Sequence, residues 1–124
     1  MRHIAEEDYQ LMSRFLFLSM AIVVMEQDMH HFQQGIFKIK EPYIKLLGQM
    51  LVEAKQQRKQ LRQTMNNGNM HVSILNRNDS FSSYLFRSKG LEEKRNYFNP
   101  AIRKKVEGIM QDLMLVTKNP STSS

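Results

Sequence analysis

Residues 11–25 read LMSRFLFLSMAIVVM, an apolar run that only two serines and one arginine interrupt. The run lies inside a longer proline-free segment, residues 4–34, which ends at Gly35. The acidic residues 6–8 suit the positive end of a helix dipole. We therefore predict a first helix over residues 4–34. Because a helix that is apolar on every side must be buried on every side, this segment organises the rest of the fold.

A second helix is predicted to begin at Glu41-Pro42, since proline is tolerated at the first helical position. It should run to about residue 65 and end at the turn-forming residues 66–68. Only a short extended connector, residues 37–40, separates it from the first helix, so the two should pack as an antiparallel hairpin. Its apolar residues recur at steps of three and four, with Arg58 at one polar position: Ile44, Leu47, Leu51, Ala54, Leu61 and Met65.

The pattern changes after residue 69. Residues 70–76 alternate in a two-residue period, residues 76–79 are rich in turn formers, and residues 81–87 are aromatic and β-prone. This pattern predicts a small β-hairpin, with a helix over residues 80–88 as the alternative. Asn99-Pro100 then predicts the start of a third helix that ends near residue 117.

The fold class predicted from these segments is mainly α. It comprises a long antiparallel helical hairpin and a C-terminal helix, with a small β-hairpin between helices two and three. We expect one helical domain over residues 1–118 and a disordered C-terminal tail over residues 119–124. Two further helices are too few to cover the first one fully, which predicts a homo-oligomer. The expected interface residues are Phe15, Leu16, Leu18, Ile22 and Val23.

Composition excludes several classes of protein. The absence of cysteine excludes a disulfide framework, a thiolate nucleophile and a zinc site with Cys ligands. The longest uncharged apolar run, residues 15–25, is shorter than the roughly 20 residues that span a bilayer. The acidic residues before it do not fit a signal peptide. We therefore expect a cytoplasmic protein without a transmembrane segment.

Positive charge is concentrated in the second part of the chain. Residues 1–41 carry four Lys/Arg and six Asp/Glu, whereas residues 42–124 carry fourteen and six. A basic region favours an anionic partner. On the second helix Lys55, Arg58, Lys59 and Arg62 are spaced to share one face, which predicts either phosphate contacts or a solvated flank. The first turn of the third helix carries Arg103, Lys104 and Lys105, a candidate anion site unless neighbouring glutamates such as Glu107 neutralise it.

Evidence for catalysis is weak. Glu26, Asp28, His30 and His31 lie near the end of the first helix, but a di-iron bundle needs a second such segment. The sequence has no phosphate-binding glycine-rich loop, G-x-S-x-G, H-E-x-x-H or calcium-loop motif. We therefore expect no cofactor, no metal and no enzymatic activity, with a metal-dependent bundle enzyme as the remaining alternative.

Three stretches resemble a bacterial family. They are residues 26–28, residues 37–43 (FKIKEPY) and residues 97–103 (YFNPAIR). Together they are similar to the YhjD-like proteins of spore-forming bacilli. The resemblance implies a bacterial cytoplasmic protein and transfers no active site.

These observations predict a non-enzymatic helical interaction or regulatory protein that acts as a homo-oligomer. A second protein is a further candidate partner. The alternative is a nucleic-acid-binding regulator that uses the basic faces of helices two and three.

Overall fold

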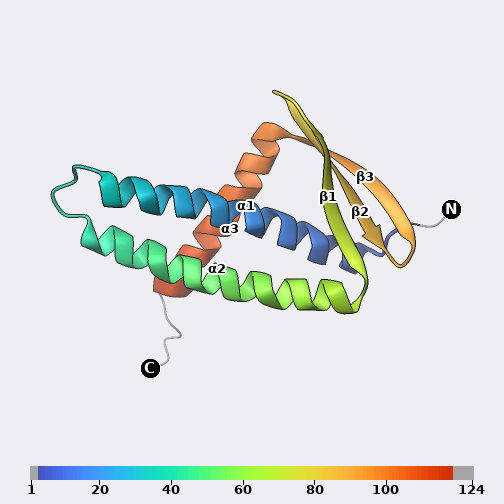
Figure 1. The fold of residues 1–124 in the computed structure, drawn as a ribbon, viewed down its shortest axis with the longest axis horizontal. Helices are drawn as coiled ribbons and strands as arrows, with labels where there is room; N and C mark the ends of the chain where they lie inside the picture. Colours follow the sequence, from blue (N-terminus) through green and yellow to red (C-terminus); the bar gives the residue numbers. More distant parts are fainter. Residues whose placement is uncertain (1–2, 119–124) are drawn as a thin grey trace.

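The computed structural model describes residues 3–118, so the predicted tail lies outside the described residues. α1 and α2 lie side by side as an antiparallel pair, α3 crosses them on one side, and the sheet stands at the end where α2 leads into β1 (Figure 1). In chain order the elements are α1 (Glu6–Gln34), α2 (Glu41–Asn67), β1 (Met70–Arg77), β2 (Phe81–Ser88), β3 (Leu91–Phe98) and α3 (Asn99–Lys118).

The helix boundaries follow the sequence signals closely. α2 carries Pro42 in its first turn, as predicted, and α3 begins at Asn99. α1 starts at Glu6, two residues later than predicted. Ile4 is outside the helix because its backbone N–H donates a 2.6 Å hydrogen bond to the Glu93 carboxylate, which fastens this end of the chain to the sheet.

The region between α2 and α3 is a three-stranded antiparallel sheet of order β1-β2-β3. The predicted hairpin of residues 70–76 and 81–87 is confirmed, and the alternative helix over residues 80–88 is wrong. The third strand was not predicted, so the fold is α+β and not purely helical. β2 and β3 are joined by Lys89 and Gly90, both with positive φ (52° and 81°), as a two-residue hairpin turn requires.

α1 is the centre of two apolar clusters. Its middle packs with α2 and α3 around Leu18, Ile22 and Met25, and its beginning packs with the sheet around Met12 and Phe86. The sheet therefore buries the beginning of α1, which the two other helices alone do not cover. α1 is also long and apolar enough to cross a bilayer by length and composition, a test that the core helix of a soluble protein passes as well.

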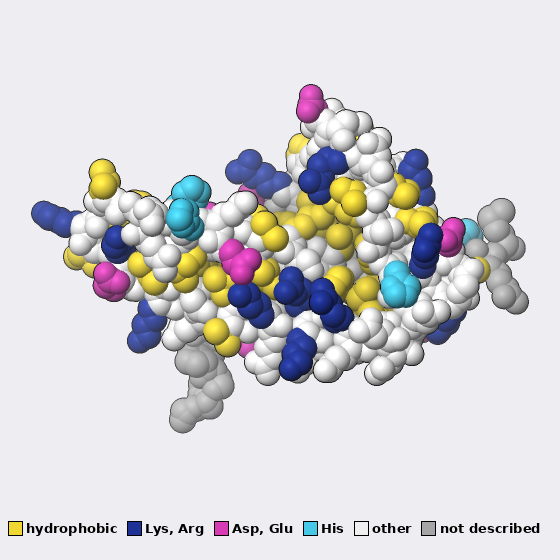
Figure 2. Space-filling view, in the orientation of Figure 1, with side chains coloured by type: hydrophobic (Ala, Val, Ile, Leu, Met, Phe, Trp, Pro, Cys, Tyr) yellow, Lys and Arg dark blue, Asp and Glu magenta, His cyan; other side chains and the backbone are white. Residues whose placement is uncertain are grey.

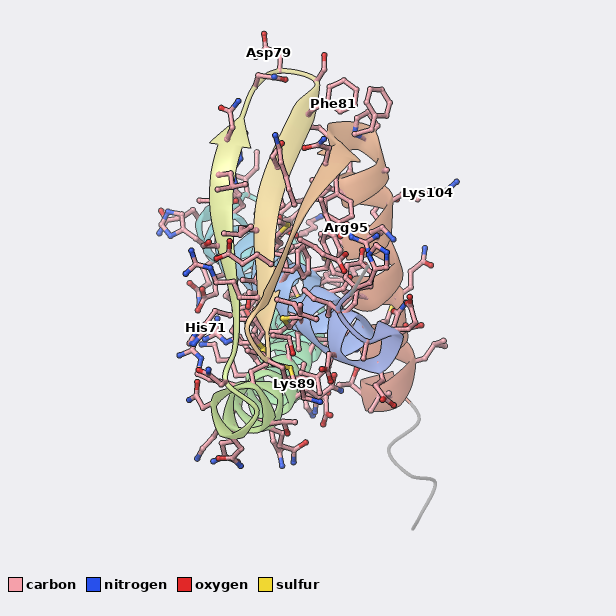
Figure 3. The ribbon with its side chains drawn as sticks, turned by 90° about the vertical axis from the view of Figure 1, so that its right-hand side faces the viewer. His71, Asp79, Phe81, Lys89, Arg95 and Lys104 are labelled. Atoms are coloured by element: carbon pink, nitrogen blue, oxygen red, sulfur yellow. The ribbon has the colours of Figure 1, made fainter. Side chains whose placement is uncertain are left out.

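The sheet reaches beyond the helices that support it. Alternate residues of β2 face the helices, and Ser82, Tyr84, Phe86 and Ser88 are all buried. On β1, Ile74 is paired with Tyr84, so its side chain lies on the same face, yet it is 51% exposed. Asp79 and Phe81 mark this projecting end, and Lys89 marks the opposite end (Figure 3). The projection leaves a space between the sheet and the helices.

Candidate functional site

A recess of about 660 Å³ lies between the projecting end of the sheet, the first half of α3 and the middle of α1. Figure 2 shows hydrophobic side chains between the sheet and the helices in this region. The volume falls within the roughly 300–1,000 Å³ typical of small-molecule sites. We call this space the recess. Its walls are formed by Met20, Val24, Asp28, Arg77, Ser82, Tyr84, Asn99, Ile102, Arg103, Val106, Glu107 and Met110.

The apolar wall of the recess comes from two helices. α1 contributes Met20 and Val24, and α3 contributes Ile102, Val106 and Met110. The α3 residues recur at steps of four, so they lie on one helical face. On α1 the wall exists because this helix is apolar on nearly every side, including the side that the sheet does not reach.

A chain of hydrogen bonds joins the sheet to the first turn of α3. The buried Ser82 hydroxyl donates to the Asn99 side-chain oxygen at 2.7 Å, and the Asn99 amide donates to the Asn78 carbonyl at 2.9 Å. The Asn99 backbone N–H donates to the Ser80 carbonyl at 2.8 Å. These groups satisfy one another, so they hold the two walls of the recess in a fixed relation.

Tyr84 is the unusual polar residue of the recess. Its side chain is 3% exposed, and its hydroxyl is buried without a hydrogen-bond partner. No other buried side-chain nitrogen or oxygen within residues 3–118 lacks a partner. An unsatisfied buried hydroxyl costs about 1–3 kcal/mol, so a partner that reached it would gain a hydrogen bond at little further cost.

The rim carries balanced charge. Arg77 and Arg103 are matched by Asp28 and Glu107, and the Arg103 guanidinium lies 3.4 Å from the Glu107 carboxylate. Arg103 and Glu107 are four residues apart on α3, and the sequence offered this pair as the way in which the basic cluster would be neutralised. A rim of two cations and two anions selects weakly for net charge.

The predicted basic cluster of α2 lies against α1. Lys55 forms a 3.0 Å ion pair with Glu26, and the Arg62 guanidinium lies 5.4 Å from the Phe15 ring centroid. Arg58 is half-buried and Lys59 is exposed. Lys and Arg side chains do gather over the middle of α2 (Figure 2).

The predicted cluster of α3 is separate. Lys105 lies over the Phe17 ring at 5.6 Å, Arg103 is paired at the rim, and Lys104 points away from the molecule on the side opposite α2 (Figure 3). The fold therefore does not combine the two basic clusters into one surface.

The residues predicted to form an oligomer interface differ in exposure. Leu18 and Ile22 are 0% and 2% exposed within the single chain, so they cannot contact a second copy. They are buried because α2 and α3 pack against this part of α1. Phe15 and Leu16 are half-buried, and Val23 is 52% exposed.

Two titratable groups outside the recess have shifted pKa values. The backbone N–H of Ile4 lowers the pKa of Glu93, and Arg95 and His3 add to the effect. Burial raises the pKa of Tyr97, and the 2.6 Å hydrogen bond between the Tyr97 and Tyr9 hydroxyls adds to that shift. Glu93 fastens the residues before α1 to β3, and Tyr97 fastens α1 itself to β3.

No cluster of three or more metal-ligating side chains occurs in the described part of the chain. Glu26, one of the four residues considered as ligands, is held instead by Lys55. Asp28 is the member of that group that reaches the recess.

Sequence reasoning missed the recess, although part of its signal was present. Asn99-Pro100 marks a strand that passes directly into a helix, which predicts a sharp junction. The alternation of β2 places Ser82 and Tyr84 on the helix-facing side. Only the crossing of α3 over α1 makes these residues neighbours.

A family model described as YhjD protein matches residues 3–118, nearly the whole chain. The chain belongs to the YhjD family. It is 32% identical over 110 residues to the uncharacterized protein YhjD of Bacillus subtilis (strain 168), which covers 89% of this chain and 92% of the relative. The resemblance inferred from the three sequence stretches is confirmed, and it places the protein in a bacterial family. No solved structure matches the chain significantly.

Proposed function

We propose that this YhjD-family member is a non-enzymatic, cytoplasmic regulatory protein that binds a small, largely apolar molecule in the recess. The observation that carries the proposal is the buried, unpartnered Tyr84 hydroxyl beside an apolar space of ligand size. Sites of this kind combine apolar walls with a few polar groups that orient the ligand.

The chemistry of the walls favours a ligand with an apolar body, little net charge and one hydrogen-bonding group. Met20, Val24 and Met110 supply apolar contacts, and the charges of the rim balance. The phenol of Tyr84 can donate to a carbonyl or ether oxygen or accept from a donor. A small rearrangement around Tyr84 on binding would bring this hydroxyl into contact with the ligand.

Binding is favoured over catalysis because Ser82 and Glu107, two groups of the recess that could take part in catalysis, are engaged by neighbouring side chains. The Ser82 hydroxyl donates a hydrogen bond to the side-chain oxygen of Asn99, and Glu107 is paired with Arg103. A nucleophile needs a base within hydrogen-bond distance, and Ser82 instead contacts an amide oxygen.

The test uses Nile red, a neutral apolar fluorophore with oxygen acceptors. The wild-type protein is expected to raise its fluorescence with saturable binding. Met110→Trp fills the recess and should abolish that binding, whereas Met114→Trp, at an exposed position of the same helix, should not. Equal binding by wild type and Met110→Trp would refute the recess as the site.

We further propose that the protein acts as a homo-oligomer, supported by the large exposed apolar side chains on its surface. Val23 is the member of the predicted interface that is more than half exposed. Light scattering after size exclusion should give a multiple of the 14.7 kDa chain mass, and Val23→Glu should reduce it. A wild-type monomer at micromolar concentration would contradict this state.

Nucleic-acid binding is the second candidate, favoured by the Lys and Arg side chains that gather over α2 (Figure 2). Arg58→Glu with Arg62→Glu should weaken binding of labelled duplex DNA or single-stranded RNA and reduce its salt dependence. The matched control is Lys104→Glu, on the opposite side (Figure 3). Unchanged affinity in the double variant would exclude this face of α2.

A further inference from the structure

The connection between α1 and α2 forms one extreme end of the molecule, far from the sheet (Figure 1). Four large apolar side chains are exposed there: Ile36 at 101%, Ile39 at 70%, Tyr43 at 56% and Phe37 at 55%. Lys38 and Lys40 lie among them in the sequence, and Lys45 follows two residues after Tyr43. We call these seven residues the hairpin tip.

The hairpin tip has a defined shape. The Phe32 ring packs on Phe37, with centroids 5.4 Å apart, and stacks on Tyr43 at 5.8 Å with an interplanar angle of 14°. The Lys40 ammonium donates to the carbonyl oxygen of Gln33 at 2.8 Å, which holds the connection against the end of α1. The aromatic rings are therefore anchored, while the two isoleucines project from them.

Gly35 allows the connection to adopt this shape. A Cβ at this position would lie 2.6 Å from the Phe37 ring, so glycine allows the ring to fold back against the end of α1. The connection is thereby held close against the end of the α1–α2 pair.

The charge at this end is positive. Three lysines face one acidic residue, Glu41, within residues 36–45. At the left end of Figure 2, hydrophobic and Lys or Arg side chains protrude together. Apolar side chains beside cations are the combination that enters a lipid headgroup region, where the apolar groups reach the acyl boundary and the cations meet anionic lipids.

We propose that the hairpin tip docks on the surface of a membrane that contains anionic lipids. Ile36 and Ile39 enter the headgroup region, and Lys38 and Lys45 contact lipid phosphates, while Lys40 holds the connection against α1. A second copy of the chain fits the tip less well, because a two-fold tip-to-tip contact would bring the lysines of both copies together. The location at one end of the long axis leaves the tip free to meet a flat surface (Figure 1).

The experiment exploits the absence of tryptophan from the chain. Ile36→Trp introduces a single tryptophan at the tip, and Phe81→Trp places one at the projecting end of the sheet as the control. With vesicles of phosphatidylcholine and phosphatidylglycerol, the fluorescence emission of the Ile36→Trp variant should shift to the blue and be quenched by brominated lipid. The tryptophan of the Phe81→Trp variant should show neither effect. No response at position 36, or an equal response at both positions, would overturn the proposal.

Co-sedimentation with the same vesicles measures affinity. Ile36→Asp with Ile39→Asp should lower it about a hundredfold, because two aliphatic side chains no longer leave water. Lys38→Gln and Lys45→Gln should each lower it about fivefold, with the effect lost on pure phosphatidylcholine. Ile74→Asp with Leu75→Asp is the matched control on β1 and should bind like the wild type.

Light scattering distinguishes a protein partner from a lipid. If the aspartate variant of the tip dissociates a wild-type oligomer and the wild type does not sediment with vesicles, the tip is covered by a second copy and the proposal is wrong. This experiment is independent of the recess, because none of the seven tip residues lines it.

Discussion

The hydroxyl of Ser88, the last residue of β2, donates a 2.9 Å hydrogen bond to the carboxylate of Asp8 in the first turn of α1. The two residues are 80 positions apart, and both are buried, at 2% and 8% exposure. Lys89 adds an ion pair with the same carboxylate at 3.5 Å. The beginning of α1 is thereby fastened to the β2–β3 turn.

Ser88→Ala should lower the free energy of unfolding by about 1.5–3 kcal/mol, the range for a hydrogen bond to a charged group. Urea denaturation followed by circular dichroism measures the change. Ser83→Ala is the control, since Ser83 bonds Asn96 on the exposed side of the sheet and its removal should cost less than about 0.5 kcal/mol. Equal losses of unfolding free energy in the two variants would mean that the buried hydrogen bond to Asp8 stabilises the protein no more than the exposed one.

Glu93→Gln should destabilise the protein in a pH-dependent manner. The Ile4 N–H, with Arg95 and His3, lowers the folded-state pKa of Glu93 below its ordinary 4.5. A lowered carboxyl pKa stabilises the fold above the unfolded pKa and loses that effect as pH falls through the folded one. The urea midpoints of wild type and Glu93→Gln should differ at pH 7 and converge below pH 4.5. A difference that persists at low pH would assign the effect to packing.

Gly90→Ala should cost about 1–2 kcal/mol, because a side chain in the left-handed region is strained. The φ of Gly90 is +81°, and a Cβ there would touch nothing, so strain is the only term. Gly108→Ala, in the middle of α3 and also in open space, should instead stabilise the protein by up to about 1 kcal/mol. Thermal melts of both variants should shift in opposite directions.

Tyr84→Phe should raise the free energy of unfolding by about 1 kcal/mol, because it removes a buried hydroxyl without a partner. The same variant should bind Nile red more weakly if the hydroxyl contacts the ligand. Tyr97→Phe, which breaks the hydrogen bond with Tyr9, should lower stability by a similar amount. A loss of stability in both variants would show that Tyr84 has a partner in solution.

β3 was not predicted from the sequence, and its residues show why. The strand alternates, but its half-buried side reads Leu91, Glu93, Arg95 and Tyr97. Two of these are charged, because Glu93 accepts the Ile4 N–H and the Arg95 guanidinium lies 4.0 Å from the Tyr9 ring centroid. A strand whose inner side binds polar groups shows no hydrophobic alternation. Figure 3 places Arg95 where β3 meets α1.

The sequence by itself determined the elements whose signals are local. Pro42 and Asn99-Pro100 start helices through their own backbone geometry, and a connector of a few residues forces α1 and α2 to be antiparallel. The apolar surface of α1 established that this helix is the core. It could not establish what covers that core, because apolar burial is non-directional and any apolar surface would serve.

Only the tertiary structure decided that the chain's own elements cover α1. α2 and α3 bury Leu18 and Ile22, which removes both from any interface, and the sheet packs against Met12. The tertiary structure also placed Tyr84 beside Met20 and Ile102, residues from three elements that form one recess. That neighbourhood depends on the angle at which α3 crosses α1 and on how far the sheet projects. Both are set by long-range packing, which no local period in the sequence encodes.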